Sequence, residues 1–129
     1  MTLLDHASVG VPAIDTARKF YDPVMAALGC SCLAALDGLA AYGRETPQFV
    51  IILPYDKQAA TAGNGTHICF AAPSRDAVDA FARAALTHGG TDEGAPGPRP
   101  GYPKADVYAA FVRDPFGNKL EAIHNGFTA

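Results

Sequence analysis

The sequence predicts an α+β fold made of two βαβββ repeats within one domain. Two long segments of the sequence align with one another without a gap. The matched pairs include His6 with His67, Pro12 with Pro73, and Phe20 with Phe81. In each segment a short apolar strand pattern is followed by helical periodicity and then by three further strand candidates. The length of 129 residues corresponds to a single domain, expected over 1–129.

The first module is expected at about 1–56. Its opening strand ends before Pro12, since proline cannot donate to a strand ladder. A helix follows, with an apolar stripe at Ala17, Phe20, Tyr21, Val24 and Leu28. The expected strands are 3–11, 30–36, 39–43 and 48–55, with a hairpin turn at Asp37 and Gly38.

The second module is expected at about 64–126. Ser74 is suited to cap its helix and Gly89 to end it. The helical stripe is expected at Val78, Phe81, Ala82, Ala85 and Leu86. The expected strands are 66–72, 91–95, 107–113 and 118–124, with a loop rich in proline and glycine at 95–104 that the first module lacks.

The composition argues against nucleic acid and membranes as partners. The net charge is −3, and the chain has no run of five basic residues. Asp5 and His6 lie where a secretion signal would need an apolar run, so we expect a cytoplasmic protein. Three cysteines, an odd number without zinc-finger spacing, are expected to be reduced thiols.

Strand alternation places several chemically active side chains on one face. If Leu3, Ala7, Val9 and Val11 face the helix, His6 and Ser8 face the other way. The same alternation puts His67 and Cys69 on the helix-free face of the second module. Glu121 joins them if Leu120 and Ala122 face the helix.

Aligning the apolar cores of the last strands matches Ile52 with Glu121. A local two-fold axis relating the modules would then bring four positions together. These positions hold His6, Ile52, His67 and Glu121. Two histidines and a carboxylate form a facial set with open coordination positions, which suits one divalent ion of Fe, Mn, Ni, Co or Zn.

The chain resembles the vicinal oxygen chelate superfamily, which includes glyoxalase I, extradiol dioxygenases, fosfomycin resistance enzymes and bleomycin resistance proteins. The resemblance lies in the opening strand and helix, in GTHICFAAPSRDAVDAF, and in DPFGNKLEAIH. It implies cup-shaped mixed sheets with helices on the outer face, a homodimer, and metal ligands at His6, His67 and Glu121.

The resemblance also shapes the expected chemistry. Ile52 stands where glyoxalase I usually has a further carboxylate or related ligand, and Phe111 stands where extradiol dioxygenases have a tyrosine. Ser8 falls where fosfomycin enzymes have a threonine near the metal. We expect Glu121, Ser8 and Tyr108 to act in catalysis.

The loop of the second module, which runs from Gly94 to Lys104, is expected to cover the pocket. Inward-facing Arg99 or Lys104 would select a substrate with a carboxylate, phosphonate or phosphate. The residues expected to contact substrate are Ile52, Cys69, Arg99, Tyr102 and Lys104.

The leading hypothesis is a metal-dependent enzyme acting on a small oxygenated molecule that chelates the ion. Lyase or isomerase chemistry, or thiol transfer, ranks above ring cleavage by a dioxygenase. A metal-free protein that binds or sequesters a small molecule, of the bleomycin resistance type, is the second hypothesis. Metal content distinguishes the two.

Overall fold

The computed structural model describes residues 3–127 and contains two modules with the same order of elements. Residues 1–2 and 128–129 of the predicted domain lie outside the described part. Module 1 contains β1 (Ala7–Gly10), α1 (Ile14–Ala26), β2 (Ser31–Ala35), β3 (Leu39–Gly43) and β4 (Phe49–Ile52). Module 2 contains β5 (His67–Ala71), α2 (Arg75–Thr87), β6 (Thr91–Pro98), β7 (Tyr108–Arg113) and β8 (Lys119–His124).

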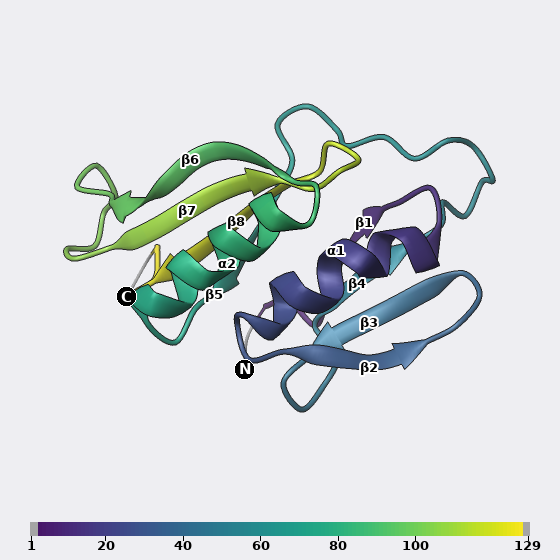
Figure 1. The fold of residues 1–129 in the computed structure, drawn as a ribbon, viewed down its shortest axis with the longest axis horizontal. Coiled ribbons are helices and arrows are strands. Elements are labelled where there is room, and N and C mark those ends of the chain that lie inside the picture. Colours follow the sequence, from purple (N-terminus) through teal and green to yellow (C-terminus); the bar gives the residue numbers. More distant parts are fainter. Residues whose placement is uncertain (1–2, 128–129) are drawn as a thin grey trace.

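Each module forms its own four-stranded mixed sheet. The strand orders are β1-β4-β3-β2 and β5-β8-β7-β6. The first and last strands of each module pair in parallel, whereas the other pairs are antiparallel. One helix covers one face of each sheet, and the two helices lie side by side (Figure 1). The predicted α+β fold with two βαβββ repeats is confirmed.

The apolar stripe of each helix forms the core, as the periodicity predicted. All five residues of the first stripe are buried, the last of them, Leu28, just beyond the end of α1. Ser74 caps α2 by accepting a hydrogen bond from the Ala77 amide at 3.1 Å. Leu86 differs from the prediction because it is 52 % exposed. It follows Ala85 directly, and one residue turns the side chain by about 100° around the helix axis, away from the stripe.

Polar and aromatic contacts join the modules along their helix-covered sides. The Tyr21 hydroxyl donates to Asp114 Oδ2 at 2.5 Å, and Asn118 Nδ2 donates to the Gly10 carbonyl at 3.0 Å. The Phe49 and Phe70 rings meet edge to face, with centroids 4.9 Å apart. These contacts link the modules without pairing strands of one sheet with strands of the other.

Three predicted strands differ from the structure by three residues or more at one end, among them the strand expected at 48–55, which is β4 at Phe49–Ile52. The first strand, expected at 3–11, is β1 at Ala7–Gly10, and Leu3, expected on the helix side, is 97 % exposed. The strand expected at 91–95 continues to Pro98, because β6 keeps pairing with β7 through two irregularities in register. Within residues 3–127, no helix is long and apolar enough to cross a membrane.

Candidate functional site

The helix-free face of module 2 carries the densest group of chemically active side chains. Its positions follow from the register of the neighbouring strands β7, β8 and β5. Two alternate rungs cross these strands: Arg113, Lys119 and His67 in one, and Phe111, Glu121 and Cys69 two residues further along. Because alternate residues of a strand share a face, all six side chains project from the same side of the sheet.

Glu121 lies at the centre of this group and is 3 % exposed. Its Oε1 atom is 3.1 Å from His67 Nε2, and its Oε2 atom accepts a hydrogen bond from the Tyr102 hydroxyl at 2.9 Å. Burial, followed by the contact with Glu121, raises the pKa of Tyr102 to about 12. Burial and the negative charge of Glu121 also raise the pKa of the Cys69 thiol. The carboxylate therefore organises the side chains around it.

His67 and Glu121 supply a nitrogen and an oxygen donor of the kind that Zn, Ni, Mn, Co and Fe(II) accept. The rest of the predicted set is not assembled in one chain. No group of three or more His, Cys, Asp or Glu side chains that could hold a metal exists among residues 3–127. The donors present thus fit a divalent ion in type, and one chain supplies them as an incomplete set.

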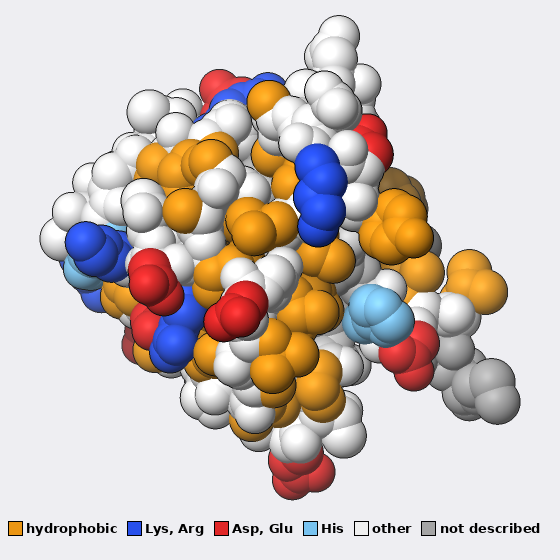
Figure 2. All heavy atoms as spheres, turned by 90° about the vertical axis from the view of Figure 1, so that its right-hand side faces the viewer, with side chains coloured by type: hydrophobic (Ala, Val, Ile, Leu, Met, Phe, Trp, Pro, Cys, Tyr) orange, Lys and Arg blue, Asp and Glu red, His pale blue; other side chains and the backbone are white. Residues whose placement is uncertain are grey.

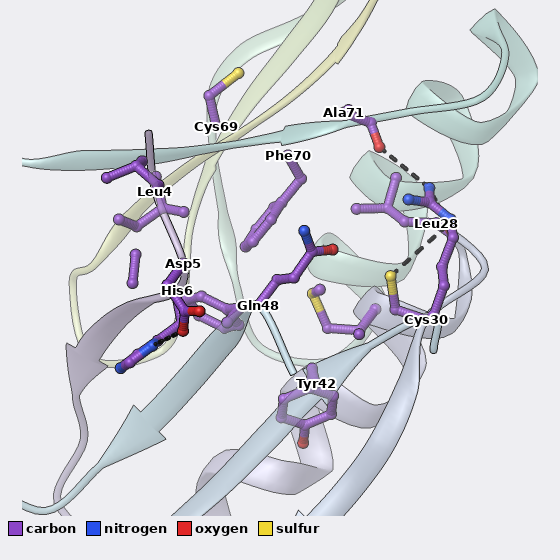
Figure 3. Close-up of a pocket in the computed structure, with 16 residues that line it drawn as sticks. Leu4, Asp5, His6, Leu28, Cys30, Tyr42, Gln48, Cys69, Phe70 and Ala71 are labelled. Carbon is purple, nitrogen blue, oxygen red and sulfur yellow. Dashed lines mark hydrogen bonds and ion pairs between the residues drawn. The ribbon is translucent and has the colours of Figure 1, made fainter. Parts of the chain in front are cut away.

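His6 lies on the other module, apart from this pair. Its ring nitrogen Nδ1 is 2.6 Å from Asp5 Oδ1, and the histidine side chain is 58 % exposed. A pocket of about 240 Å³ between the modules is lined by both His6 and Cys69. Figure 3 shows these two side chains pointing away from one another. The intermodule pocket therefore does not bring His6 to the carboxylate.

The strand register corrects the predicted match between Ile52 and Glu121. In module 2, Cys69 lies opposite Glu121, and in module 1 the repeat counterpart of Cys69, Ser8, lies opposite Val50. Val50 is therefore the counterpart of Glu121. Ile52 lies two residues further along β4, opposite Gly10. The prediction was wrong by two residues because Val50 and Ile52 share a face and both fit an apolar strand pattern.

Val50 and His6 lie close together in module 1. Both line the same surface hollow, together with Gln48. This hollow places an exposed imidazole beside an apolar side chain at the position where module 2 has its carboxylate. Ser8 lies opposite Val50 in the strand pairing, on the predicted face of the sheet. Module 1 therefore presents His6 with its neighbour Asp5, and has an apolar side chain where module 2 has the buried carboxylate.

The loop between β6 and β7 brings Tyr102 to Glu121. The Tyr102 ring also packs against Phe127, with centroids 5.3 Å apart. Since β6 extends to Pro98, the covering segment begins at Arg99, whereas the sequence predicted a start at Gly94. Lys104 is half-buried and lines a different surface hollow, next to Arg75.

The Arg99 guanidinium is largely engaged by the backbone at the end of β6. It donates to the carbonyl groups of Ala95, Gly97 and Pro98 at 2.8, 3.1 and 3.3 Å. Its Cζ atom also lies 5.8 Å from the centre of the Phe111 ring. Arg99 therefore shapes the loop and adds positive charge next to the helix-free face.

Tyr108 lies on the opposite side of the sheet from Glu121. Its hydroxyl donates to Asp79 Oδ1 of α2 at 2.6 Å, and the Arg75 guanidinium lies 4.9 Å from its ring centre. Both contacts face the helix. The catalytic role expected from its position after the loop thus has no geometric support, and the site excludes Tyr108.

Sequence reasoning missed three side chains on this face: Arg113, Lys119 and Phe111. Lys119 is two residues before Glu121, so strand alternation was a sufficient signal to find it on the same face. Phe111 was noticed only as the residue standing where dioxygenases have a tyrosine. Lys119 Nζ lies 5.2 Å from the centre of the Phe111 ring, and the His67 ring centre lies 6.1 Å from it.

Comparison with known proteins gives a family match and similar solved structures. Residues 3–122 match the family described as the Glyoxalase/Bleomycin resistance protein/Dioxygenase superfamily. A crystal structure of a glyoxalase/bleomycin resistance protein from Albidiferax ferrireducens T118 is 36 % identical, with a TM-score of 0.87. The alignment covers 97 % of this chain and 100 % of that one. Among curated proteins, none matches this sequence.

More distant structures share the fold. A glyoxalase-related enzyme from Fulvimarina pelagi is 14 % identical, with a TM-score of 0.72 and coverage of 97 % of this chain and 89 % of that one. A lactoylglutathione lyase from Agrobacterium tumefaciens is 19 % identical, with a TM-score of 0.65 and coverage of 96 % and 93 %. At these identities the likeness establishes the architecture alone. With the family match over nearly the whole chain and the 36 % identical structure, this chain belongs to the Glyoxalase/Bleomycin resistance protein/Dioxygenase superfamily.

Proposed function

We propose that this protein is a metal-dependent enzyme whose site is shared between two copies of the chain. His67 and Glu121 of one copy and His6 of the other hold one divalent ion. The observation that carries this proposal is the separation of the ligand set within one chain. His67 contacts the buried carboxylate of Glu121, whereas His6 lies apart on module 1.

A second copy can supply the missing half because the two modules are repeats. Pairing module 1 of one copy with module 2 of another around a two-fold axis generates two equal sites in a closed dimer. The side of the molecule formed by module 1 carries hydrophobic side chains over much of its area, with scattered charged ones between them (Figure 2). An apolar surface of this kind is suited to association.

The metal would act as a Lewis acid toward substrate oxygen atoms and stabilise the negative charge that develops on them. Glu121 is placed to hold or accept a proton at Oε2, where the Tyr102 hydroxyl now donates. The same hydroxyl orients the carboxylate, and the loop that carries it shields Glu121 from water. Ser8 contributes a hydroxyl from the module 1 side of the shared site.

The side chains around Glu121 favour isomerase, lyase or thiol-transfer chemistry over ring cleavage. Phe111 lies directly opposite Glu121 on β7 and offers no hydroxyl group. The substrate class that fits is a small oxygenated anion, because Arg99 and Lys119 add positive charge beside the carboxylate. Family membership supports a small-molecule substrate, and we expect a homodimer in the cytoplasm.

A metal-free binding protein is the second candidate. It is favoured by the fact that the part of one chain the structure describes assembles no three-ligand group. In that case the helix-free face would bind a small anion through its polar side chains without performing chemistry. The two candidates differ in metal content and in the effect of Glu121 substitution.

Complementation between variants tests the shared site. His6→Ala and Glu121→Gln should each lose bound Zn(II) or Mn(II), measured by elemental analysis after loading, while His88→Ala serves as a matched histidine control. Refolding the two defective variants together creates mixed dimers with one intact site each. The mixture should recover about a quarter of the wild-type metal content, since about half of the dimers are mixed and each contains one intact site of two.

The possible failures have different meanings. A wild-type protein that binds no divalent ion would overturn the metal-dependent enzyme and leave the binding protein. Metal binding without any recovery in the mixture would show that all the ligands come from one chain, and would overturn the shared site alone.

A further inference from the structure

Lys119 lies between two groups that cannot neutralise its charge. On β8 it pairs in register with Arg113 of β7 on one side and with His67 of β5 on the other. Positive side chains directly opposite one another in a sheet repel. Arg113 is compensated by Glu93, whose Oε1 atom lies 2.7 Å from the arginine Nε, and it also donates to the Gly117 carbonyl.

Lys119 has no such compensation. Its half-buried side chain reaches the Phe111 ring, and no carboxylate of residues 3–127 lies within ion-pair distance of its ammonium group. Glu121, two residues along the same strand, is engaged by His67 and Tyr102. A lysine charge that is partly removed from water and lacks a partner costs free energy, unless a ligand supplies the partner.

The Phe111 ring holds the ammonium group in a defined place. Lys119 Nζ and Arg99 Cζ lie 5.2 and 5.8 Å from the ring centre, at cation–π distance. Arg99 also lacks a carboxylate partner within the described chain, since its hydrogen bonds go to backbone carbonyls. Two positive charges therefore converge on one aromatic ring at the edge of the buried Glu121 carboxylate.

We propose that Lys119, held on Phe111, is the anion-binding residue of this site and receives the carboxylate or phosphorus oxyanion of the substrate. The proposal rests on the proposed function in placing that substrate at His67 and Glu121. Adjacent strands are about 4.8 Å apart, and alternate residues of a strand are about 7 Å apart. A small acid whose charged group lies a few atoms from its chelating oxygens spans this spacing.

The opposite wall of the shared site has no equivalent cation. By the corrected register the module 1 counterparts of Lys119 and Phe111 are Gln48 and Ala41, next to Val50. The module 2 wall thus carries the cations, whereas the equivalent positions of module 1 are uncharged. The substrate binds with its anionic end toward module 2 and its uncharged part toward module 1.

The test uses inorganic phosphate as the probe and the metal-free full-length protein, so that binding to a metal cannot contribute. Phosphate is titrated while backbone amide NMR signals are followed. The wild-type protein should show saturable shifts centred on 119–121 and 111. Lys119→Met, which keeps the length of the side chain over Phe111, should weaken phosphate binding about tenfold or more, whereas Lys119→Arg should retain it. Lys57→Met, in the connection between the modules, is the control.

Metal content of the same variants is measured in parallel, and Lys119→Met should bind as much metal as wild type. Unchanged phosphate affinity in Lys119→Met, or equal weakening in Lys57→Met, overturns the anion site even if metal binds. If Lys119→Met loses phosphate binding and the wild-type protein binds no metal, the anion site stands. The metal-dependent function is then overturned.

Discussion

Val50 of β4 occupies the register position that Glu121 occupies in β8. Each lies opposite the residue two positions after the histidine of its own module, which is Ser8 for Val50 and Cys69 for Glu121. The two modules therefore offer the same constellation of a histidine and a neighbouring side chain. In module 1 the neighbour is apolar, and in module 2 it is a buried carboxylate.

Replacing Val50 by glutamate should add a fourth ligand to the proposed metal site. We expect Val50→Glu to tighten metal binding, measured by competition with a chelator. Without metal the variant should be less stable than wild type, because a half-buried carboxylate without a partner costs about 1 to 3 kcal/mol. Loading with metal should recover the lost stability.

Ile52→Glu provides the matched control, since it places the same group on the same face one alternation further along β4. It should destabilise the protein equally with and without metal. If Ile52→Glu tightens metal binding and Val50→Glu does not, the register argument fails and the original alignment is restored.

The buried contact between Tyr21 and Asp114 should contribute measurably to the stability of the paired modules. The Tyr21 hydroxyl is one of several donors to this 3 % exposed carboxylate, which also accepts from Phe116 and Asn118. Tyr21→Phe should lower the free energy of unfolding by about 1.5 to 3 kcal/mol in denaturant titrations, as expected for a hydrogen bond to a charged group.

Tyr55→Phe is the control for this substitution, because Tyr55 is 98 % exposed. Its effect should stay within about 0.5 kcal/mol. Equal stability of the Tyr21 and Tyr55 variants would show that the intermodule hydrogen bond does not contribute.

Stability should fall in alkaline solution because of Tyr21 and Tyr42. Burial and contacts with Asp114 and Asp22 raise the pKa of these tyrosines in the folded state. Above about pH 10 the unfolded chain loses the phenolic protons while the folded chain keeps them, so the unfolded state binds fewer protons and the free energy of unfolding decreases. Each such tyrosine contributes a slope of about 1.4 kcal/mol per pH unit once its unfolded form is ionised.

The measurement compares wild type with a Tyr21→Phe/Tyr42→Phe double variant in denaturant titrations between pH 8 and 11. The double variant should be less stable at pH 8 and should lose less stability as the pH rises. Parallel pH curves for the two proteins would contradict a contribution from these side chains.

Arg99 should hold the loop over the site by its contacts with backbone carbonyls. Arg99→Ala removes the hydrogen bonds to Ala95, Gly97 and Pro98. Hydrogen exchange of the Arg99–Val107 segment should accelerate by about tenfold or more, which corresponds to about 1.4 kcal/mol of local opening free energy. Lys104→Ala should leave exchange unchanged, and an equal acceleration in both variants would argue against this role of Arg99.

Much of the fold could be predicted because the sequence repeats. Apart from Leu86, the helical stripes lie in the core, and strand alternation correctly placed His67 and Glu121 on the helix-free face, where they contact one another. Tyr102 and Tyr108 show that this reasoning could not predict which side chains they contact. Both were expected near the substrate, yet the loop turns Tyr102 onto Glu121 while alternation along β7 turns Tyr108 onto Asp79.

The sequence by itself determined the two modules, the faces of their strands and the chemical types of the side chains on those faces. The tertiary structure decided which residues are neighbours: Val50 as the counterpart of Glu121, Lys119 beside His67, and His6 apart from both. The physical reason is that alternation has a period of two, so it specifies a face and leaves the register undetermined by steps of two residues. Register and the packing of one module on the other depend on hydrogen bonds and side-chain contacts between segments far apart in the chain, such as Tyr21 with Asp114.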